Sequence, residues 1–398
     1  MAKTLLKSVF ACSLAVISGQ QAWADESGAA GIPWGPVSVY PSVGLALGND
    51  DNLLLSNANR ISTSFEVLSP QARFETQHRG DIYALTYHAD LGRYNNSSPD
   101  NYNDQSLVGQ ADTAISSRAA LKIRPEYILG HDPRGTTYGV FTAVPNKWRN
   151  AGVSGVYGYG SEGAKGRIEI SAGFLGTKYL NNRYLTYAYD KNTTDLGGTF
   201  FYRVMPKTSL LFQALNTRYV YDNASSLVPN NTVRNYMVGA KWEATAKTTG
   251  DVRIGQIQQR YDGGAIPNFT GTGWNGTIQW SPREYSRVKL DLTKQPEQTT
   301  LAGSSSYIVT SSSADWAYDW NSRFTSHVNL ARITENFGGL GLSTRNNSYG
   351  LGMDYRIRRW LKGALSWTSW AKAANQAAYS SFFDYNRNVV MLTLTGTL

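Results

Sequence analysis

The sequence predicts an all-β fold, a transmembrane antiparallel up-and-down β-barrel of about 18 strands, with 16 as the alternative count. Short turns recur along the chain at similar intervals, and the segments between them alternate apolar with polar side chains. Charged residues make up only 17% of the 398 residues, whereas soluble domains usually contain about 25%. Mean hydropathy is −0.37, and beyond the N-terminus no apolar run is long enough to be a spanning helix.

The first residues have the parts of a secretory signal peptide. Lys3 and Lys7 precede an apolar stretch at Ser8–Ser18, and Ala22-Trp23-Ala24 has the small-x-small pattern of a cleavage site. We therefore predict that residues 1–24 are a signal peptide that directs the chain to the bacterial outer membrane.

The rest of the chain reads as one unit. Residues 25–36 form a predicted short periplasmic lead, and residues 37–398 form the predicted barrel. The single cysteine, Cys12, belongs to the signal peptide, so the mature chain must be stabilised without disulfides. Closing a sheet into a barrel does this by pairing every strand edge.

Eight short turns set the strand count. They lie 36 to 45 residues apart, with a longer polar loop between each pair. Outer-membrane barrels combine short periplasmic turns with long external loops. Eight turns join sixteen strands, and one strand more at each end gives eighteen. The turns are Arg79-Gly80, Ser117-Arg118, Glu162-Gly163-Ala164-Lys165, Pro206-Lys207, Ala246-Lys247, Pro282-Arg283, Asn321-Ser322 and Arg358-Arg359.

Side-chain alternation supports the same fold. After the turn at Arg118, Leu121 and Ile123 share one face and Lys122 and Arg124 share the other. Four further segments repeat the pattern, at 167–174, 235–243, 287–292 and 349–358. The pattern fails at 209–219, near Pro70 and near Ile257, where a bulge or a shifted register would explain it.

Aromatic residues separate this fold from a soluble β-sandwich, whose apolar face would be an aliphatic core. Here Tyr and Trp gather at strand ends on the apolar face, as in the aromatic girdle of a membrane barrel. These residues are Tyr83, Tyr94, Trp242, Trp280, Trp316, Trp320, Tyr355 and Trp367. The C-terminal residues Val390, Leu392 and Leu394 alternate with polar ones, which suits a strand read by the barrel-assembly machinery.

Charged residues of the polar face gather near the short turns, at the periplasmic mouth of the predicted lumen. Eleven basic and seven acidic residues would favour anions, because rings of Lys or Arg select for them. Cross-strand ion pairs that stiffen the wall are the other interpretation, and we rank it first. The residues are Lys122, Arg124, Arg167, Arg203, Lys241, Arg253, Arg287, Lys289, Arg356, Arg358 and Lys362, with Glu126, Glu169, Glu243, Asp251, Asp291, Asp319 and Asp354.

Catalytic motifs are absent from the sequence, which has neither G-x-S-x-G nor H-E-x-x-H nor G-x-x-x-x-G-K. His88 and Asp90 share the inward face of one strand, as the Asp-His pair of a barrel protease would. The other interpretation is that they are two of many polar residues that line the lumen. Asn49-Asp50-Asp51-Asn52 offers oxygen ligands for calcium without the spacing of a calcium loop. We predict no enzyme, cofactor, bound metal or nucleic-acid partner.

The stretch from Leu45 to Gly135 resembles the putative β-barrel porin type 2 family, which includes exopolysaccharide-associated outer-membrane proteins of the EpsL kind. The resemblance rests on Gly48-Asn49-Asp50-Asp51-Asn52-Leu53, Leu68-Ser69-Pro70, Tyr83-Ala84-Leu85-Thr86-Tyr87, Leu91-Gly92-Arg93-Tyr94 and Tyr102-Asn103-Asp104. It implies an outer-membrane channel that assists polysaccharide export, with outer-membrane lipid, polysaccharide and separate periplasmic secretion proteins as partners.

A general or anion-preferring diffusion porin that carries small solutes is the alternative function. A porin usually narrows its pore with a loop folded inward, and Pro133–Trp148 is the one candidate loop for that role.

Overall fold

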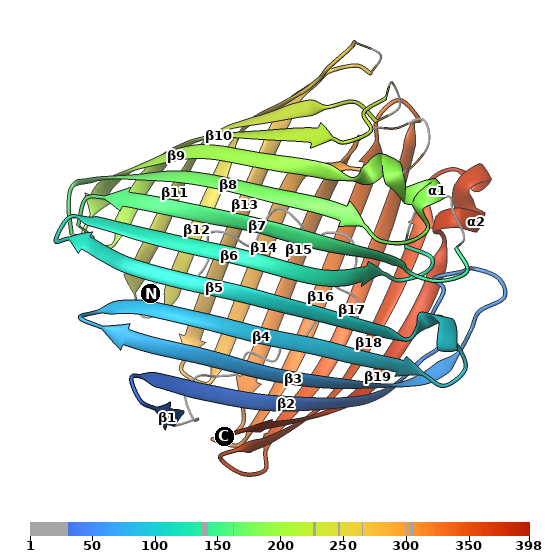
Figure 1. The fold of residues 1–398 in the computed structure, drawn as a ribbon, viewed down its shortest axis with the longest axis horizontal. Helices are drawn as coiled ribbons and strands as arrows, with labels where there is room; N and C mark the ends of the chain where they lie inside the picture. Colours follow the sequence, from blue (N-terminus) through green and yellow to red (C-terminus); the bar gives the residue numbers. More distant parts are fainter. Residues whose placement is uncertain are drawn as a thin grey trace.

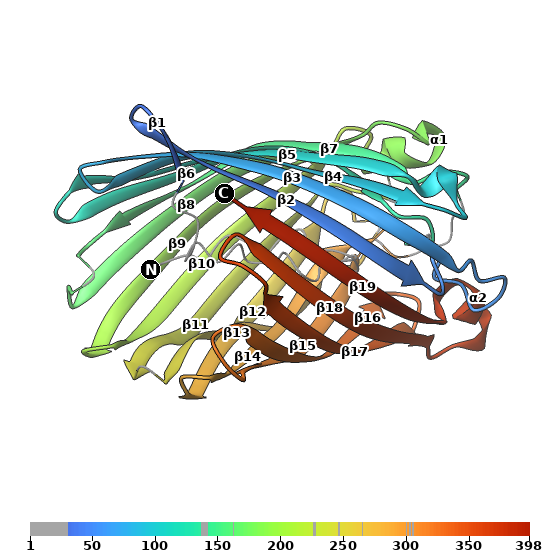
Figure 2. The same ribbon diagram turned by 90° about the horizontal axis from the view of Figure 1, so that it is seen from below.

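Eighteen antiparallel strands, β2 to β19, close into a barrel (Figure 1; Figure 2), which confirms the predicted fold and the higher strand count. The computed structural model describes residues 31–398, apart from 137–141, 162, 226–227, 246, 265, 300, 302–303 and 305. Each strand pairs with the next along the chain, and β19 pairs with β2 to close the wall. The predicted signal peptide lies outside the described residues. No helix in the described part of the chain is long and apolar enough to cross a membrane.

The strands of the wall are similar in length, between 13 and 16 residues. They are β2 (Val37–Asp50), β3 (Thr63–His78), β4 (Asp81–Tyr94), β5 (Tyr102–Ser116), β6 (Ala119–Asp132), β7 (Asn146–Tyr159), β8 (Gly166–Tyr179), β9 (Lys191–Met205), β10 (Thr208–Tyr221), β11 (Asn231–Thr245), β12 (Thr248–Tyr261), β13 (Phe269–Arg283), β14 (Ser286–Gln298), β15 (Ser306–Asp319), β16 (Phe324–Phe337), β17 (Leu342–Arg356), β18 (Leu361–Ala374) and β19 (Tyr385–Thr397). Short helical segments occupy three loops, as η2 (Ser98–Asp100), α1 (Arg183–Thr186) with η3 (Tyr187–Tyr189), and η4 (Ala377–Tyr379) with α2 (Ser380–Phe383).

The short turns lie at one end of the barrel and the longer loops, with α1 and α2, at the other (Figure 1). We call the parts of the wall near these ends the turn half and the loop half. Seven turns fall where the sequence predicts them. The prediction at Pro282-Arg283 is wrong by two residues, because both belong to β13 and the turn is at 284–285. A register irregularity between Trp280 and Arg283 lets Pro282, which has no N–H to donate, remain in the strand.

A short strand, β1 (Ile32–Trp34), precedes the barrel within the predicted lead and pairs with the start of β2. β19 stops pairing with β2 at the Thr397–Ser42 pair. β1 therefore continues along β2 beyond the end of the C-terminal strand.

The two faces of the wall differ as the alternation predicts. Large apolar side chains are exposed on the outer face, for example Leu351 at 54% and Leu392 at 45%. The inner face carries the polar side chains that alternate with them. A wall of this kind can contact lipid with its apolar outer face and enclose a polar interior with its inner face.

Two of the three segments with a mixed pattern, near Pro70 and near Ile257, keep their register, so the expected bulge or shift is wrong there. At 209–219 the expected shift is present at the start of the segment, where the register of β10 with β9 changes between Thr208 and Ser209. β10 pairs residue by residue with β11. The β3–β4 register is the same on both sides of Pro70. Ile257 packs on the inner face against Met237, Val233 and Tyr219. Small apolar clusters on the inner face therefore cause the irregular pattern.

Most of the predicted girdle residues are exposed on the outer face, among them Trp280, Trp316 and Trp320. Tyr94 is an exception, since it is only 6% exposed and packs against Phe65 and Tyr102 on the inner face. The prediction that Tyr94 belongs to the outer girdle is therefore wrong. The sequence pattern could not distinguish the two positions, because an aromatic ring is favourable both at lipid headgroups and in a packed interior.

Candidate functional site: the inner wall of the barrel

Ion pairs between near neighbours line the turn half of the inner face. Three join residues two apart on one strand, and four join diagonal neighbours on adjacent strands, where long side chains reach each other. The pairs are Arg124–Asp112 at 3.4 Å, Arg167–Glu169 at 2.8 Å, Arg253–Asp251 at 2.8 Å, Lys289–Asp291 at 2.7 Å, Lys362–Asp354 at 2.7 Å, His327–Asp354 at 3.1 Å and Arg287–Asp319. The geometry thus brings together many of the charges that the sequence analysis singled out.

Other predicted residues lie on the same inner face of the turn half. Lys122 and Glu126 share the inner face of β6 with Arg124, and Glu243 lies on β11 at the turn end. Within the described residues, no carboxylate lies within ion-pair distance of Arg203 or Lys241.

Two predicted arginines lie at the turn-side rim. Arg356 is the last residue of β17, and its guanidinium donates to the carbonyl of Ser322 at 3.4 Å. Arg358 belongs to the turn that follows β17 and so lies beyond the strand face on which the sequence analysis placed it.

Buried tyrosines and amides replace ion pairs in part of the loop half. The Tyr221 hydroxyl donates to Gln298 Oε1 at 3.1 Å, and Asn231 Nδ2 donates to the same oxygen at 3.2 Å. Gln259 Nε2 donates to Asn231 Oδ1 at 3.1 Å. Asn231 and Gln259 are completely buried, and so the network is packed away from water.

This network joins strands that are not neighbours. Tyr221 ends β10 and Gln298 ends β14, four strands away, a path along the wall of about 19 Å at the usual strand spacing. β13 and β14 stop pairing above Trp274 and Lys294, and the last residues of β14 pair only with β15. The end of β14 therefore leaves β13 and contacts β10 and β11 from the inner side. We call Tyr221, Asn231, Gln259 and Gln298 the loop-half bridge.

A second set of inner-face contacts lies beside the bridge. Asp132 accepts hydrogen bonds from Trp148 Nε1 at 2.9 Å and from the Tyr179 hydroxyl at 3.1 Å. His131 Nδ1 lies 2.9 Å from Asp104, and its ring lies 4.4 Å from that of Tyr102. The sequence analysis missed these residues because it assigned aromatic side chains to the outer face. Alternation with outward-facing neighbours could have placed Asp132, Trp148 and Tyr179 inside.

The Asp50 region fastens the two terminal strands of the wall together. Arg387 on β19 binds both carboxylate oxygens of Asp50 through Nε and Nη2, and the two side chains are 4% and 0% exposed. Asn52 Nδ2 donates to the carbonyls of Ser56 and Asn386, each at 2.7 Å. The Asp51 carboxylate accepts from Asn388. These oxygens are committed to protein donors, so the predicted calcium alternative at 49–52 is not supported. No metal-ligand cluster occurs among the described residues.

Two glycines of the same motifs make room for aromatic packing. A Cβ at Gly92 would lie 2.0 Å from the Tyr102 ring, and one at Gly48 would lie 2.4 Å from the Phe65 ring. The residues that carry the family resemblance therefore close and pack the barrel.

His88 and Asp90 do not form a catalytic arrangement with a nucleophile. Asp90 accepts a hydrogen bond from the Ser69 hydroxyl at 2.5 Å and lies 3.1 Å from His88 Nε2. Ser69 thus bonds to the carboxylate, whereas a serine nucleophile needs its hydroxyl on the imidazole.

Several solved outer-membrane proteins share the fold at low sequence identity. OccK2 (OpdF) from Pseudomonas aeruginosa matches with a TM-score of 0.52 and 12% identity, over 90% of this chain and 98% of its own. OpdK from the same organism gives 0.50 and 12%, over 91% and 98%. OccAB3 from Acinetobacter baumannii gives 0.50 and 9%, over 91% and 99%. No curated protein matches the sequence.

The family is shown by a match along nearly the whole chain. The family model described as "Putative beta-barrel porin 2" matches residues 25–398. Family and fold together indicate a porin-like channel of the outer membrane, and both resemble channels without enzymatic activity. The chain belongs to the "Putative beta-barrel porin 2" family.

Proposed function

We propose that the protein is a passive diffusion channel for small polar solutes. The observation that carries this proposal is the closed 18-stranded wall, whose inner face is polar and whose turn-half charges are largely paired. A barrel of this size has room for an aqueous path. Paired charges leave little net field, which suits a channel with weak charge preference.

The loop-half bridge supplies the narrowing that a selective diffusion channel needs. It draws the end of β14 toward β10 and β11 and holds it with buried hydrogen bonds. The sequence analysis gave this role to Pro133–Trp148. Residues 137–141 of that loop lie outside the described residues, and Asn146–Trp148 belong to β7. The assignment of that loop therefore stays a prediction.

Ion preference in this proposal comes from the basic residues that have no carboxylate of the described residues within ion-pair distance. Arg203 and Lys241 lie on β9 and β11 among paired neighbours. Their positive charges lie near Glu243 and Asp251, and so they favour anions only weakly. The ion pairs of the turn half, such as Arg167–Glu169 and Lys289–Asp291, line the path and stiffen the wall.

Polysaccharide export is the other function that the sequence suggests, and it rests on the resemblance at Leu45–Gly135. The family match and the solved barrels of similar fold support a porin better than an exporter. The motifs behind the resemblance have packing roles in the wall, as Asp50 and Gly92 show. These motifs therefore do not indicate which solute or polymer the channel carries.

Liposome swelling tests the diffusion channel directly. Purified barrel in liposomes should admit neutral sugars at rates that fall steeply with sugar size, because the bridge limits the width of the path. Liposomes with heat-denatured protein serve as the control. Equal, negligible swelling in both preparations would contradict the proposal.

Gene deletion separates the two functions. A diffusion channel predicts unchanged surface and periplasmic polysaccharide and slower uptake of small solutes. Polysaccharide that builds up in the periplasm of the deletion strain would instead favour export.

A further inference from the structure

Basic side chains form an interrupted ring on the outer face of the loop half, with members on eight of the eighteen strands. Each alternates with exposed outer-face residues of its strand, so its side chain points away from the lumen. The residues are Arg93, Lys147, Arg149, Lys178, Arg218, Arg234, Arg260, Arg332 and Arg345. Among the described strands, Glu66 is the acidic residue of this face in the loop half. Asp222 and Asp262, at the starts of two loops, pair with Lys178 and Arg218.

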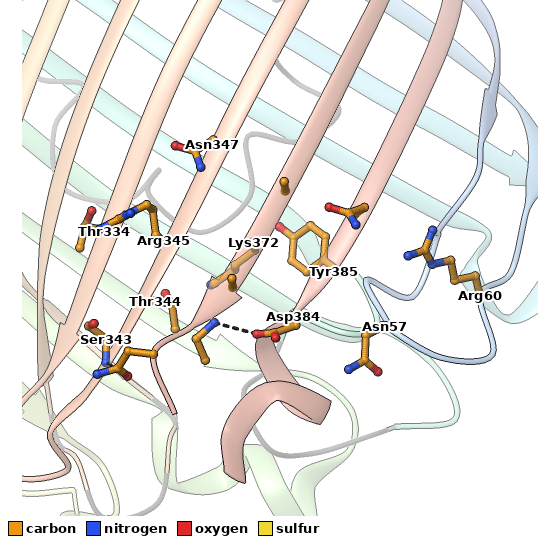
Figure 3. Close-up of a pocket in the computed structure, with 15 residues that line it drawn as sticks. Asn57, Arg60, Thr334, Ser343, Thr344, Arg345, Asn347, Lys372, Asp384 and Tyr385 are labelled. Atoms are coloured by element: carbon orange, nitrogen blue, oxygen red, sulfur yellow. Dashed lines mark hydrogen bonds between the residues drawn. The ribbon is translucent and has the colours of Figure 1, made fainter. Parts of the chain in front are cut away.

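One part of this ring is hollowed into a groove of about 570 Å³. Its floor is formed by Ala371 and Ala373 of β18, opposite Asn347 and Arg345 of β17 in the sheet register. Figure 3 shows Arg345 and Asn347 on one side, and Arg60 of the β2–β3 loop on the other. The small floor residues leave the space between these walls open.

The groove belongs to the outer face. Arg345 and Asn347 share their strand face with Tyr349 and Leu351, which are exposed at 50% and 54%. Five lining residues of β17 and β18 belong to this outer face, namely Ser343, Arg345, Asn347, Ala371 and Ala373, and three of the inner face, Thr344, Lys372 and Ala374, also border the groove. A ligand that contacts Arg345 and Asn347 therefore reaches them from the membrane or the cell surface.

Positive charge dominates the groove. Arg332 Nε donates to Asn347 Oδ1 at 2.8 Å, which brings a further guanidinium beside Arg345. No carboxylate of the described residues lies within 4 Å of Arg60, Arg332 or Arg345. Asp384 at the edge accepts a hydrogen bond from the backbone N–H of Ala374 at 2.7 Å (Figure 3).

The height of the groove matches the headgroup layer. Arg345 lies four residues beyond Tyr349, the last apolar residue of that face of β17. Four residues span about 13 Å of strand, or about 10 Å along the membrane normal at the usual tilt. An arginine at that height is beyond the hydrocarbon and beside lipid headgroups.

We propose that this groove binds the headgroup of an anionic glycolipid of the outer leaflet, one whose amino sugars carry phosphates. Arg60, Arg332 and Arg345 would bind the phosphate oxygens, because the guanidinium fork matches phosphate geometry. Asn57, Ser343 and Asn347 offer hydrogen-bonding groups to sugar hydroxyls. The alanine floor leaves room for a sugar ring. The inference depends on the outer-membrane location and is independent of what passes through the lumen.

Lipid binding to the full-length barrel tests the proposal. Delipidated protein in detergent is titrated with bisphosphorylated lipopolysaccharide, and bound lipid is counted by native mass spectrometry. Arg60→Ala/Arg345→Ala should raise the Kd about tenfold, since each exposed charge contact contributes up to a few-fold. Ala373→Trp fills the groove without removing charge and should weaken binding similarly. Retained heat-modifiable migration in a gel shows that each variant is folded.

The control removes the same charge at the other end of the barrel. Arg79→Ala/Arg118→Ala alters two exposed turn residues and should leave the Kd within twofold. Equal binding by wild type and the groove double variant would overturn the proposal. So would an equal loss in Arg149→Ala/Lys178→Ala, which would assign binding to the whole ring. Dephosphorylated lipid should bind weakly. Displacement of the lipid by millimolar inorganic phosphate would point to a free-phosphate site instead.

Discussion

The two halves of the inner wall are held together in different ways. In the turn half, charged side chains pair with neighbours on the same or the next strand, as Arg167 does with Glu169. In the loop half, buried contacts join residues far apart in sequence, as Arg387 and Asp50 are. The turn half can form as each hairpin forms. The pair between Arg387 and Asp50 can form only when the barrel has closed, because it joins the first and last strands of the wall.

The two kinds of contact should contribute differently to the free energy of unfolding. Partly exposed ion pairs contribute roughly 0–1 kcal/mol each, because water screens them. Removing one partner of a buried pair costs roughly 3–5 kcal/mol, because the other charge is left without a partner. Stability should therefore be concentrated in the loop half, while the turn half tunes the charge of the wall.

The largest expected effect comes from removing the buried ion pair between Arg387 and Asp50. Arg387→Ala should lower the free energy of unfolding by about 3–5 kcal/mol, since it leaves the buried Asp50 carboxylate unpaired. Arg167→Ala, the matched change in the turn half, should cost less than about 1 kcal/mol. Urea unfolding in detergent, followed by tryptophan fluorescence, measures both. Equal losses would remove the distinction between the two halves.

Glycine packing gives the next largest effect. Gly92→Ala places a Cβ 2.0 Å from the Tyr102 ring and should cost about 1–3 kcal/mol through overpacking. Gly198→Ala meets nothing within 4 Å and should change stability by less than about 0.5 kcal/mol. The same unfolding measurement applies. A loss at Gly198 as large as at Gly92 would show that backbone entropy, and not packing, sets the cost.

Local patterns predicted the strands well. The turn at Arg79-Gly80 and the alternation around Ile123 depend on residues close in sequence, and the structure reproduces both. The pairs Arg167–Glu169 and Lys289–Asp291 join residues two apart, so alternation alone brings them together.

Contacts across the barrel could not be predicted in this way. Asp50 and Arg387 are 337 positions apart, and their pairing follows from closure of the wall. The exit of β14 from the β13 pairing depends on Gln298 contacting Tyr221 and Asn231, 77 and 67 positions away, which no local pattern indicates. The outer groove is lined by Arg60 of the β2–β3 loop and Arg345 of β17, which are far apart in the sequence and meet only in the folded barrel.

Opening the loop-half bridge should change transport more than stability. Tyr221→Ala/Gln298→Ala removes the ring and amide that join β10 to β14 and should raise single-channel conductance roughly 1.5- to 2-fold. Thr277→Ala/Asn329→Ala, an inner-face change in the turn half, should leave conductance nearly unchanged. A larger increase in conductance in the turn-half variant would show that the narrowest part of the path lies in the turn half, contrary to the proposal.

Charge reversal at the unpaired basic residues should have the smallest effect. Arg203→Glu/Lys241→Glu should reduce the anion-to-cation permeability ratio by about twofold, because it reverses two positive charges of the inner wall. Lys289→Gln, in a pair with Asp291, should change the ratio less. Reversal potentials across planar bilayers in a salt gradient provide the measurement. A cation preference already present in wild type would contradict the assigned role of Arg203 and Lys241.

Single-channel recording of the wild-type barrel tests the central claim most directly. Folded, heat-modifiable protein added to a planar bilayer should give discrete conductance steps that persist at both voltage polarities. Their size should be smaller than an unobstructed 18-stranded barrel would allow, because the loop-half bridge narrows the path. Folded protein that inserts into the bilayer and never conducts would contradict the assignment of this chain as a diffusion channel.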